Sequence, residues 1–100
     1  MKIHKTRIKK TTKANGSVQY VAEYKWGFWW YQFDDCMGPS GNARDIYLSY
    51  RIAMHEKGGL PDRSEKQAKE IIDFYIERVK YQNACVMENK VVKVEYEGYP

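Results

Sequence analysis

Six aromatic residues lie within eight positions in the first third of the chain, and this run constrains the fold more than any other stretch. The run holds all three tryptophans of the protein, and its members are Trp26, Phe28, Trp29, Trp30, Tyr31 and Phe33. Each buried ring removes a large apolar area from water. These side chains must therefore dominate a core, an interface or both.

The residues before the run predict a β-hairpin. Apolar residues occupy the even positions from Val18 to Trp26, which is the period of a half-buried strand. Residues 3–12 favour a preceding strand, and Ala14-Asn15-Gly16 is typical of the turn between the two. A two-residue loop would place Ile8 opposite Glu23, whereas a three-residue loop with Gly16 left-handed places Ile8 opposite Ala22. The three-residue loop is preferred because it groups the apolar residues on one face.

Gly27 interrupts the alternation and allows two interpretations. It is either a bulge within one long strand or part of a tight turn into a third strand, residues 28–33. The turn is preferred because a two-stranded ribbon needs a third strand for stability. Such a strand would carry Phe28 and Trp30 on one side and Trp29, Tyr31 and Phe33 on the other.

Residues 46–54 are ambiguous between strand and helix. Five apolar residues alternate without a miss from Ile46 to Met54, which favours a strand. A helix is the alternative, with Asn42 as its cap and Gly58-Gly59 as its stop. The strand is the preferred prediction, and residues 34–42 are expected to form a loop because they are dense in turn formers.

The second half of the chain predicts one long helix over residues 64–81. Ser64 and Gln67 match a capping box, and apolar residues then recur at spacings of three and four. Residues 83–89 are expected to form a connection, and 91–96 a last strand. The expected fold is α+β: a single domain, residues 1–100, in two layers, with a twisted antiparallel sheet of about four to five strands and the helix on one face.

Composition indicates in which cellular compartment the protein is expected. No apolar run approaches the roughly 18 residues that span a bilayer, so no membrane partner is expected. Cys36 and Cys85 lack the Cys-x-x-Cys spacing of zinc and redox sites. A reduced, cytoplasmic location is therefore the expectation.

The net charge of +4 is concentrated at the N-terminus. Residues 1–25 carry seven basic residues and one acid, Glu23. Cations on a β-ribbon beside aromatic rings can contact nucleic-acid phosphates, and lysines on an edge strand can also serve only to prevent sheet-to-sheet aggregation. If the hairpin binds nucleic acid, the residues that carry the binding are Lys5, Arg7, Lys9, Lys10 and Lys13.

Catalytic patterns are scarce in the sequence. There are only two histidines, so no histidine cluster can hold a metal. The one acidic doublet, Asp34-Asp35, fits the end of a strand and the start of a turn, because neighbouring extended residues point to opposite faces. Ser64 fits a helix cap better than a nucleophile. A non-enzymatic protein without metal or cofactor is expected.

The aromatic run also has two interpretations. A single helix can cover only one face of the third strand, so the second face is either closed by the loop over residues 34–45 or exposed as an interface. Interfaces concentrate binding energy in tryptophan, tyrosine and arginine. The expected partner-binding residues are Trp26, Trp29, Trp30 and Tyr31.

The overall pattern resembles small accessory proteins of bacteriophages and prophages. The resemblance lies in the short polar hairpin turn, Phe-Trp-Trp-Tyr at 28–31, Ser-x-x-Gln-Ala at 64–68, Ile-Ile-Asp-Phe-Tyr at 71–75 and the final Tyr-Pro. It implies a protein that binds and inhibits a host complex, including defence systems such as CRISPR effectors. The sequence departs from acidic DNA-mimic inhibitors, since its pI is about 9.0.

The sequence therefore predicts a binding protein that occupies a surface of a host protein or nucleoprotein complex through an aromatic face and the basic hairpin. Direct binding of nucleic acid by the hairpin is the first alternative. A homodimeric structural protein, whose aromatic face or edge strand pairs with itself, is the second. Both a monomer and a homodimer are compatible with the sequence.

Overall fold

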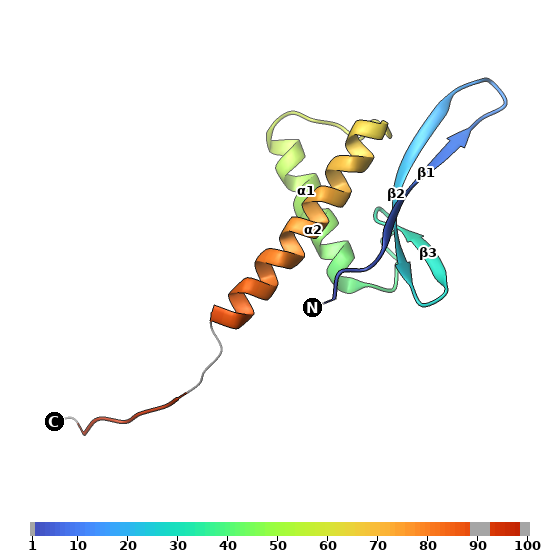
Figure 1. Cartoon of the computed structure of the whole chain (residues 1–100). Helices are drawn as coiled ribbons and strands as arrows, with labels where there is room; N and C mark the ends of the chain where they lie inside the picture. Colours follow the sequence, from blue (N-terminus) through green and yellow to red (C-terminus); the bar gives the residue numbers. More distant parts are fainter. Residues whose placement is uncertain (1, 89–92, 99–100) are drawn as a thin grey trace.

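The computed structural model describes residues 2–88 and 93–98, and within them a three-stranded antiparallel sheet lies against two helices (Figure 1). The elements in chain order are β1 (Thr6–Thr12), β2 (Val18–Trp26), β3 (Trp29–Gln32), α1 (Gly41–Glu56) and α2 (Glu65–Glu88). The sheet order is β1-β2-β3. The α+β class is confirmed, with fewer strands than the expected four to five and with two helices instead of one.

The β1–β2 hairpin has the register that the three-residue loop predicts. Ile8 pairs with Ala22 and Lys10 with Tyr20, so the apolar residues of both strands share one side of the sheet. Gly16 has a φ of +85°, a conformation in which glycine carries no steric cost. Its N–H donates to the Lys13 carbonyl at 2.9 Å and so closes the turn.

A second tight turn joins β2 to β3 at Gly27. Trp26 pairs with Trp29, so the turn holds only Gly27 and Phe28, and Gly27 has a φ of +63°. The predicted turn is confirmed, and the long-strand alternative is wrong. The consequence is that Trp26, Phe28 and Trp29 all lie at this end of the sheet.

The preferred strand over residues 46–54 is wrong, because this segment lies within α1. Ile46 and Tyr50 are buried, whereas Leu48 and Ile52 are 58% and 62% exposed. The alternating pattern thus mixed core and surface residues. The buried residues, Ile46 and Tyr50, are instead four positions apart, which is the spacing of one helix face. The helix begins after Ser40, whose Oγ accepts from the Ala43 N–H at 3.2 Å, and not at the expected Asn42.

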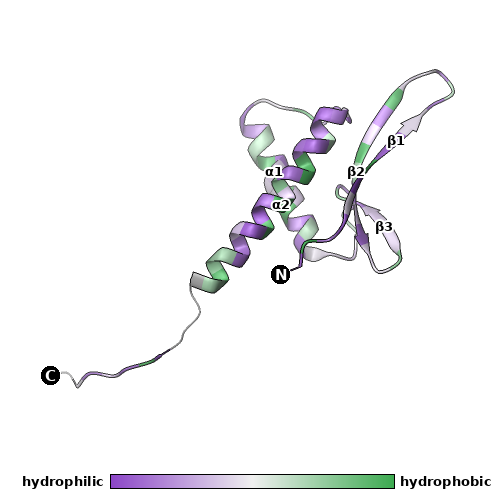
Figure 2. Cartoon of the chain, viewed as in Figure 1, coloured by the Kyte–Doolittle hydropathy of each residue, from purple (hydrophilic) through white to green (hydrophobic). Residues whose placement is uncertain are grey.

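The predicted helix over residues 64–81 is present as α2, which continues to Glu88. Its cap is partly as expected: Ser64 Oγ accepts from the Gln67 N–H at 3.1 Å, but the Gln67 side chain reaches the Asp62 N–H. The expected connection over residues 83–89 is wrong up to residue 88, since no glycine or proline stops the helix there. Beyond the core, the last turns show apolar colour in Figure 2, and Val86 and Met87 are 69% and 72% exposed.

The predicted C-terminal strand over residues 91–96 lies partly outside the described residues. Its described part, residues 93–96, is not a strand. Tyr96 is 93% exposed and does not contribute to the core. The expected last strand is therefore not part of the described sheet.

The core lies between the sheet and the two helices, and aromatic residues form its centre. Tyr24, Phe33 and Tyr75 are buried, and Phe33 makes edge-to-face contacts with both tyrosines at ring-centroid distances of 5.1 Å. The segment after β3 closes the same side of the sheet, since the Ser40 N–H donates to the Tyr24 hydroxyl at 3.4 Å. Neither helix in the described part of the chain combines the length and apolarity that crossing a membrane requires.

Candidate binding surfaces of the sheet

The aromatic run is divided between the two sides of the sheet. Tyr31 and Phe33 point to the helix side, where Tyr31 stacks with Tyr24 at 6.1 Å and Phe33 joins the core. Trp30 pairs with Lys25 and so lies on the opposite side. The four predicted partner-binding residues therefore do not form one surface: Tyr31 packs against the core, Trp30 lies on the other face, and Trp26 and Trp29 lie at the sheet end.

Three exposed rings gather at the β2–β3 turn, and we call Trp26, Phe28 and Trp29 the aromatic tip. Their exposed fractions are 42%, 93% and 72%. The ring of His4 packs against Trp26 at 5.3 Å, which holds the N-terminal segment beside the tip. A hollow of about 440 Å³ lies next to it, lined by Lys2, Ile3, His4, Lys5, Lys25, Trp26 and Gly27. The tip is thus an apolar cluster bordered by lysines.

The side of the sheet that faces away from the helices is here called the open face. By register it carries Lys5, Arg7, Lys9 and Thr11 from the first strand segment, Gln19, Val21, Glu23 and Lys25 from β2, and Trp30 and Gln32 from β3. Three of the predicted nucleic-acid residues, Lys5, Arg7 and Lys9, therefore share this face. Lys10 pairs with Tyr20 on the helix side, and Lys13 lies in the turn after β1.

At the centre of the open face, Arg7, Glu23 and Trp30 form a compact group. Glu23 is only 4% exposed, and its Oε1 accepts from Arg7 Nε at 2.7 Å. The Arg7 guanidinium carbon lies 4.2 Å from the centroid of the Trp30 ring, which is a cation–π contact. Sequence reasoning did not single out Glu23. The signal was available, because the preferred register places it directly opposite Arg7.

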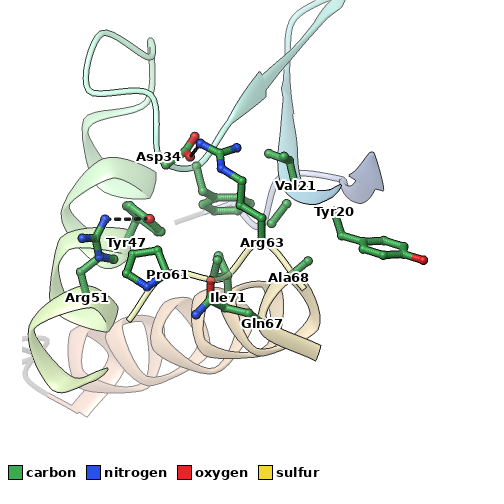
Figure 3. A pocket seen from close by; sticks show the side chains of 12 residues that line it. Tyr20, Val21, Asp34, Tyr47, Arg51, Pro61, Arg63, Gln67, Ala68 and Ile71 are labelled. Carbon is green, nitrogen blue, oxygen red and sulfur yellow. Dashed lines mark hydrogen bonds and ion pairs between the residues drawn. The ribbon is translucent and has the colours of Figure 1, made fainter. Parts of the chain in front are cut away.

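A cavity of about 280 Å³ opens where β3 ends and β2 continues (Figure 3). Arg63 lies at its wall with a φ of +52°, and its carbonyl accepts from the Tyr20 N–H at 2.9 Å. Its guanidinium pairs with Asp34 at 3.3 Å. The strained residue thus ties the loop before α2 to the edge of β2, and Asp34 balances its charge.

The acidic doublet Asp34-Asp35 and Ser64, which the sequence offered as catalytic alternatives, have structural roles among the described residues. Asp35 accepts the Gly38 N–H on its carbonyl and the Met37 N–H on its carboxylate, so the acidic doublet belongs to a turn, as predicted. No group of three or more metal-ligating side chains forms in the described part of the chain. Ser64 is a helix cap, as predicted.

The buried tyrosines are held in the neutral form. Burial raises the pKa of Tyr24 and Tyr75 above the usual 10.0. Burial of Tyr50, together with the hydrogen bond that its hydroxyl donates to Glu70 at 3.1 Å, raises its pKa to about 12. These phenols therefore act as hydrogen-bonding groups of the core.

The chain was compared with protein-family models, with curated proteins and with solved structures, and none of the three comparisons found a match.

Proposed function

We propose that this protein is a non-enzymatic binding protein that occupies a surface of a protein or nucleoprotein complex. The aromatic tip would contact protein, and the cations of the open face would contact nucleic acid where the complex contains it. The observation that carries the proposal is the tip itself, where Phe28 in the two-residue turn and Trp29 next to it are 93% and 72% exposed.

The physical argument rests on the cost of exposed rings. Large aromatic side chains left in water lose the stabilisation that burial would give, and clusters of them on a surface mark binding sites. Tryptophan is enriched among the residues that dominate binding energy at interfaces. The short turn fixes the backbone between Trp26 and Trp29, so little conformational entropy would be lost when a partner covers them.

A second candidate function, direct binding of nucleic acid, is supported by a separate observation. Lys5, Arg7 and Lys9 are exposed and follow one another on the same side of an edge strand. A row of cations on one face attracts a phosphate backbone. This surface is the opposite side of the sheet from the rings of Trp26 and Trp29, so the two functions can be separated by mutation.

The resemblance to phage accessory proteins supports a host complex as the partner. In that setting the protein would act in the host cytoplasm as an inhibitor, by covering a surface that the host complex needs. An anti-defence role, with a CRISPR effector or a similar complex as target, is the form of this proposal that the resemblance implies.

The tip is tested by affinity capture from a bacterial host lysate with the wild type and with the double variant Phe28→Ala/Trp29→Ala. We expect the double variant to lose the specific partner at least tenfold, because both rings would be buried in the contact. Leu48→Ala is the matched control, since it removes a 58% exposed apolar side chain from α1. Equal recovery by the double variant and the control would contradict the proposal.

The homodimer alternative is decided by molar mass in solution. Self-association through the aromatic tip predicts a dimer at high protein concentration that Phe28→Ala and Trp29→Ala convert to a monomer. A wild-type monomer at the same concentration would leave the tip available for a different partner.

A further inference from the structure

We propose that the open face binds in the major groove of double-stranded DNA, with Arg7 as the side chain that reads a base edge. This inference rests on the nucleic-acid function proposed above and specifies its partner. It is independent of the aromatic tip, so the tip can bind protein whether or not this proposal holds.

Arg7 is held in a fixed orientation by two contacts. Its Nε–H donates to the nearly buried Glu23 carboxylate at 2.7 Å, and its guanidinium carbon lies 4.2 Å from the centroid of the Trp30 ring. Its two terminal amino groups have no hydrogen-bond partner among the described residues, and the side chain is 47% exposed. An arginine oriented in this way presents free donors and loses little entropy when it binds.

The burial of Glu23 indicates that its pairing with Arg7 is a fixed part of the structure. A carboxylate removed from water costs several kcal/mol unless it is paired and hydrogen-bonded. Here the partner is an exposed arginine on the side of the sheet away from the helices. The carboxylate holds the inner edge of the guanidinium and leaves its outer edge free for a bidentate acceptor, such as the O6 and N7 atoms of guanine.

The neighbours of Arg7 supply the other groups that a groove contact requires. Thr11, Gln19 and Gln32 share the open face and carry hydroxyl or amide groups, which bond to base edges. Lys5 and Lys9 flank Arg7 and can pair with phosphates. Side chains on one face of a strand recur about every 6.8 Å, close to two base-pair steps of about 3.4 Å.

The geometry favours duplex DNA over other nucleic acids. A two-stranded ribbon fits the major groove of B-DNA, and the β1–β2 hairpin extends away from the helices as such a ribbon beyond Arg7, which itself lies where β3 also pairs with β2 (Figure 1). The major groove of duplex RNA is too narrow to be read by side chains. Single strands bind through exposed rings, but the one ring on the open face among the residues of β1, β2 and β3 is Trp30, which is only partly exposed and packed against Arg7.

The first test measures fluorescence anisotropy of the full chain with a mixed-sequence duplex DNA, its single strand, and the corresponding duplex RNA. We expect the duplex DNA to bind at least tenfold more tightly than the other two at 50 mM salt. Contacts of Lys5 and Lys9 to two phosphates predict a loss of about tenfold at 200 mM salt. If none of the three nucleic acids binds, both this inference and the nucleic-acid function are overturned. Tighter binding to the single strand or to duplex RNA would overturn the inference alone.

The second test examines base reading, by selection of bound duplexes from a randomised DNA pool. The wild type should enrich a guanine at one position, and Arg7→Lys, which keeps the charge but lacks the fork, should lose that preference. Glu23→Gln should lose it as well, although the removal of the carboxylate raises the net charge of the protein by one. Arg78→Lys is the matched control, since Arg78 also stacks on an aromatic ring, that of Phe74 on α2 at 5.3 Å.

The Glu23→Gln variant separates the proposal from simple charge attraction. Attraction alone predicts tighter binding with an unchanged sequence profile, and that result would overturn the role of Arg7. If Glu23→Gln does not fold, Arg7→Lys decides the question, because Arg7 is exposed and its aliphatic stem is kept. A wild-type pool without any enriched base would overturn base reading.

Discussion

At the scale of single residues, the polar groups of the core determine how the fold responds to pH. Tyr50 is 8% exposed and donates its hydroxyl proton to Glu70. Ionisation of the phenol would place a negative charge beside a carboxylate in a poorly hydrated site. The neutral tyrosine is therefore the form that the folded state favours.

The pKa of about 12 for Tyr50 predicts alkaline destabilisation. A group whose pKa is raised on folding stabilises the protein fully below its unfolded pKa, near 10, and the contribution is lost as the pH rises through about 12. The expected loss in the free energy of unfolding is on the order of 2 kcal/mol. Urea unfolding at pH 9 and pH 11.5 measures it. Tyr50→Phe should show a smaller loss over this range, and an equal loss in both proteins would contradict the assignment.

At the scale of elements, each of the two helices begins at a serine whose side chain caps its first turn. Ser40 Oγ accepts from the Ala43 N–H at 3.2 Å, and Ser64 Oγ accepts from the Gln67 N–H at 3.1 Å. Each bond satisfies a backbone donor that has no partner within its helix. The caps thus fix where each helix starts relative to the sheet.

Replacement of either cap by alanine should lower the free energy of unfolding by about 1 kcal/mol. Ser49→Ala is the control, because Ser49 lies inside α1 and donates its hydroxyl to the Asp45 carbonyl, an interaction that does not favour a helix. Urea unfolding of the three variants tests this prediction. A control that loses as much stability as Ser64→Ala would show that the cap geometry is not the cause.

The elements also show which parts of the fold could be predicted from the sequence. The β1–β2 register and the Gly27 turn followed from local rules, because turn chemistry and the alternation of apolar residues agree there. Residues 46–54 were predicted wrongly because Leu48 and Ile52 are apolar yet face solvent, which imitates a strand period. Patterns of neighbouring residues do not predict which apolar side chains remain exposed to solvent.

The candidate binding surfaces could be predicted only in part. The cations and rings were identified from composition, but their division between the open face and the aromatic tip depends on the register of β3 against β2. Glu23 was missed because a single acid in the second strand of the hairpin resembles an ordinary surface residue. Its burial arises from the three-dimensional arrangement with Arg7 and Trp30.

At the scale of the whole molecule, the structure divides into a supporting layer and a presenting layer. Both helices lie on one side of the sheet, where they bury Ala22, Tyr24 and Phe33 (Figure 1). The opposite side carries Lys5, Arg7 and Lys9, and the sheet end carries the exposed rings. The central claim is that partners are contacted by the sheet while the helices hold it in place.

The most direct test is a ¹H–¹⁵N NMR titration of the full chain with duplex DNA. The account predicts that the backbone amides of Lys5, Arg7 and Lys9 and the indole N–H of Trp30 shift with increasing DNA. The amides around Leu48 and Ile52 on the exposed side of α1 should stay unchanged. Shifts concentrated on α1 or α2, with β1 unaffected, would contradict the claim that the sheet is the binding layer.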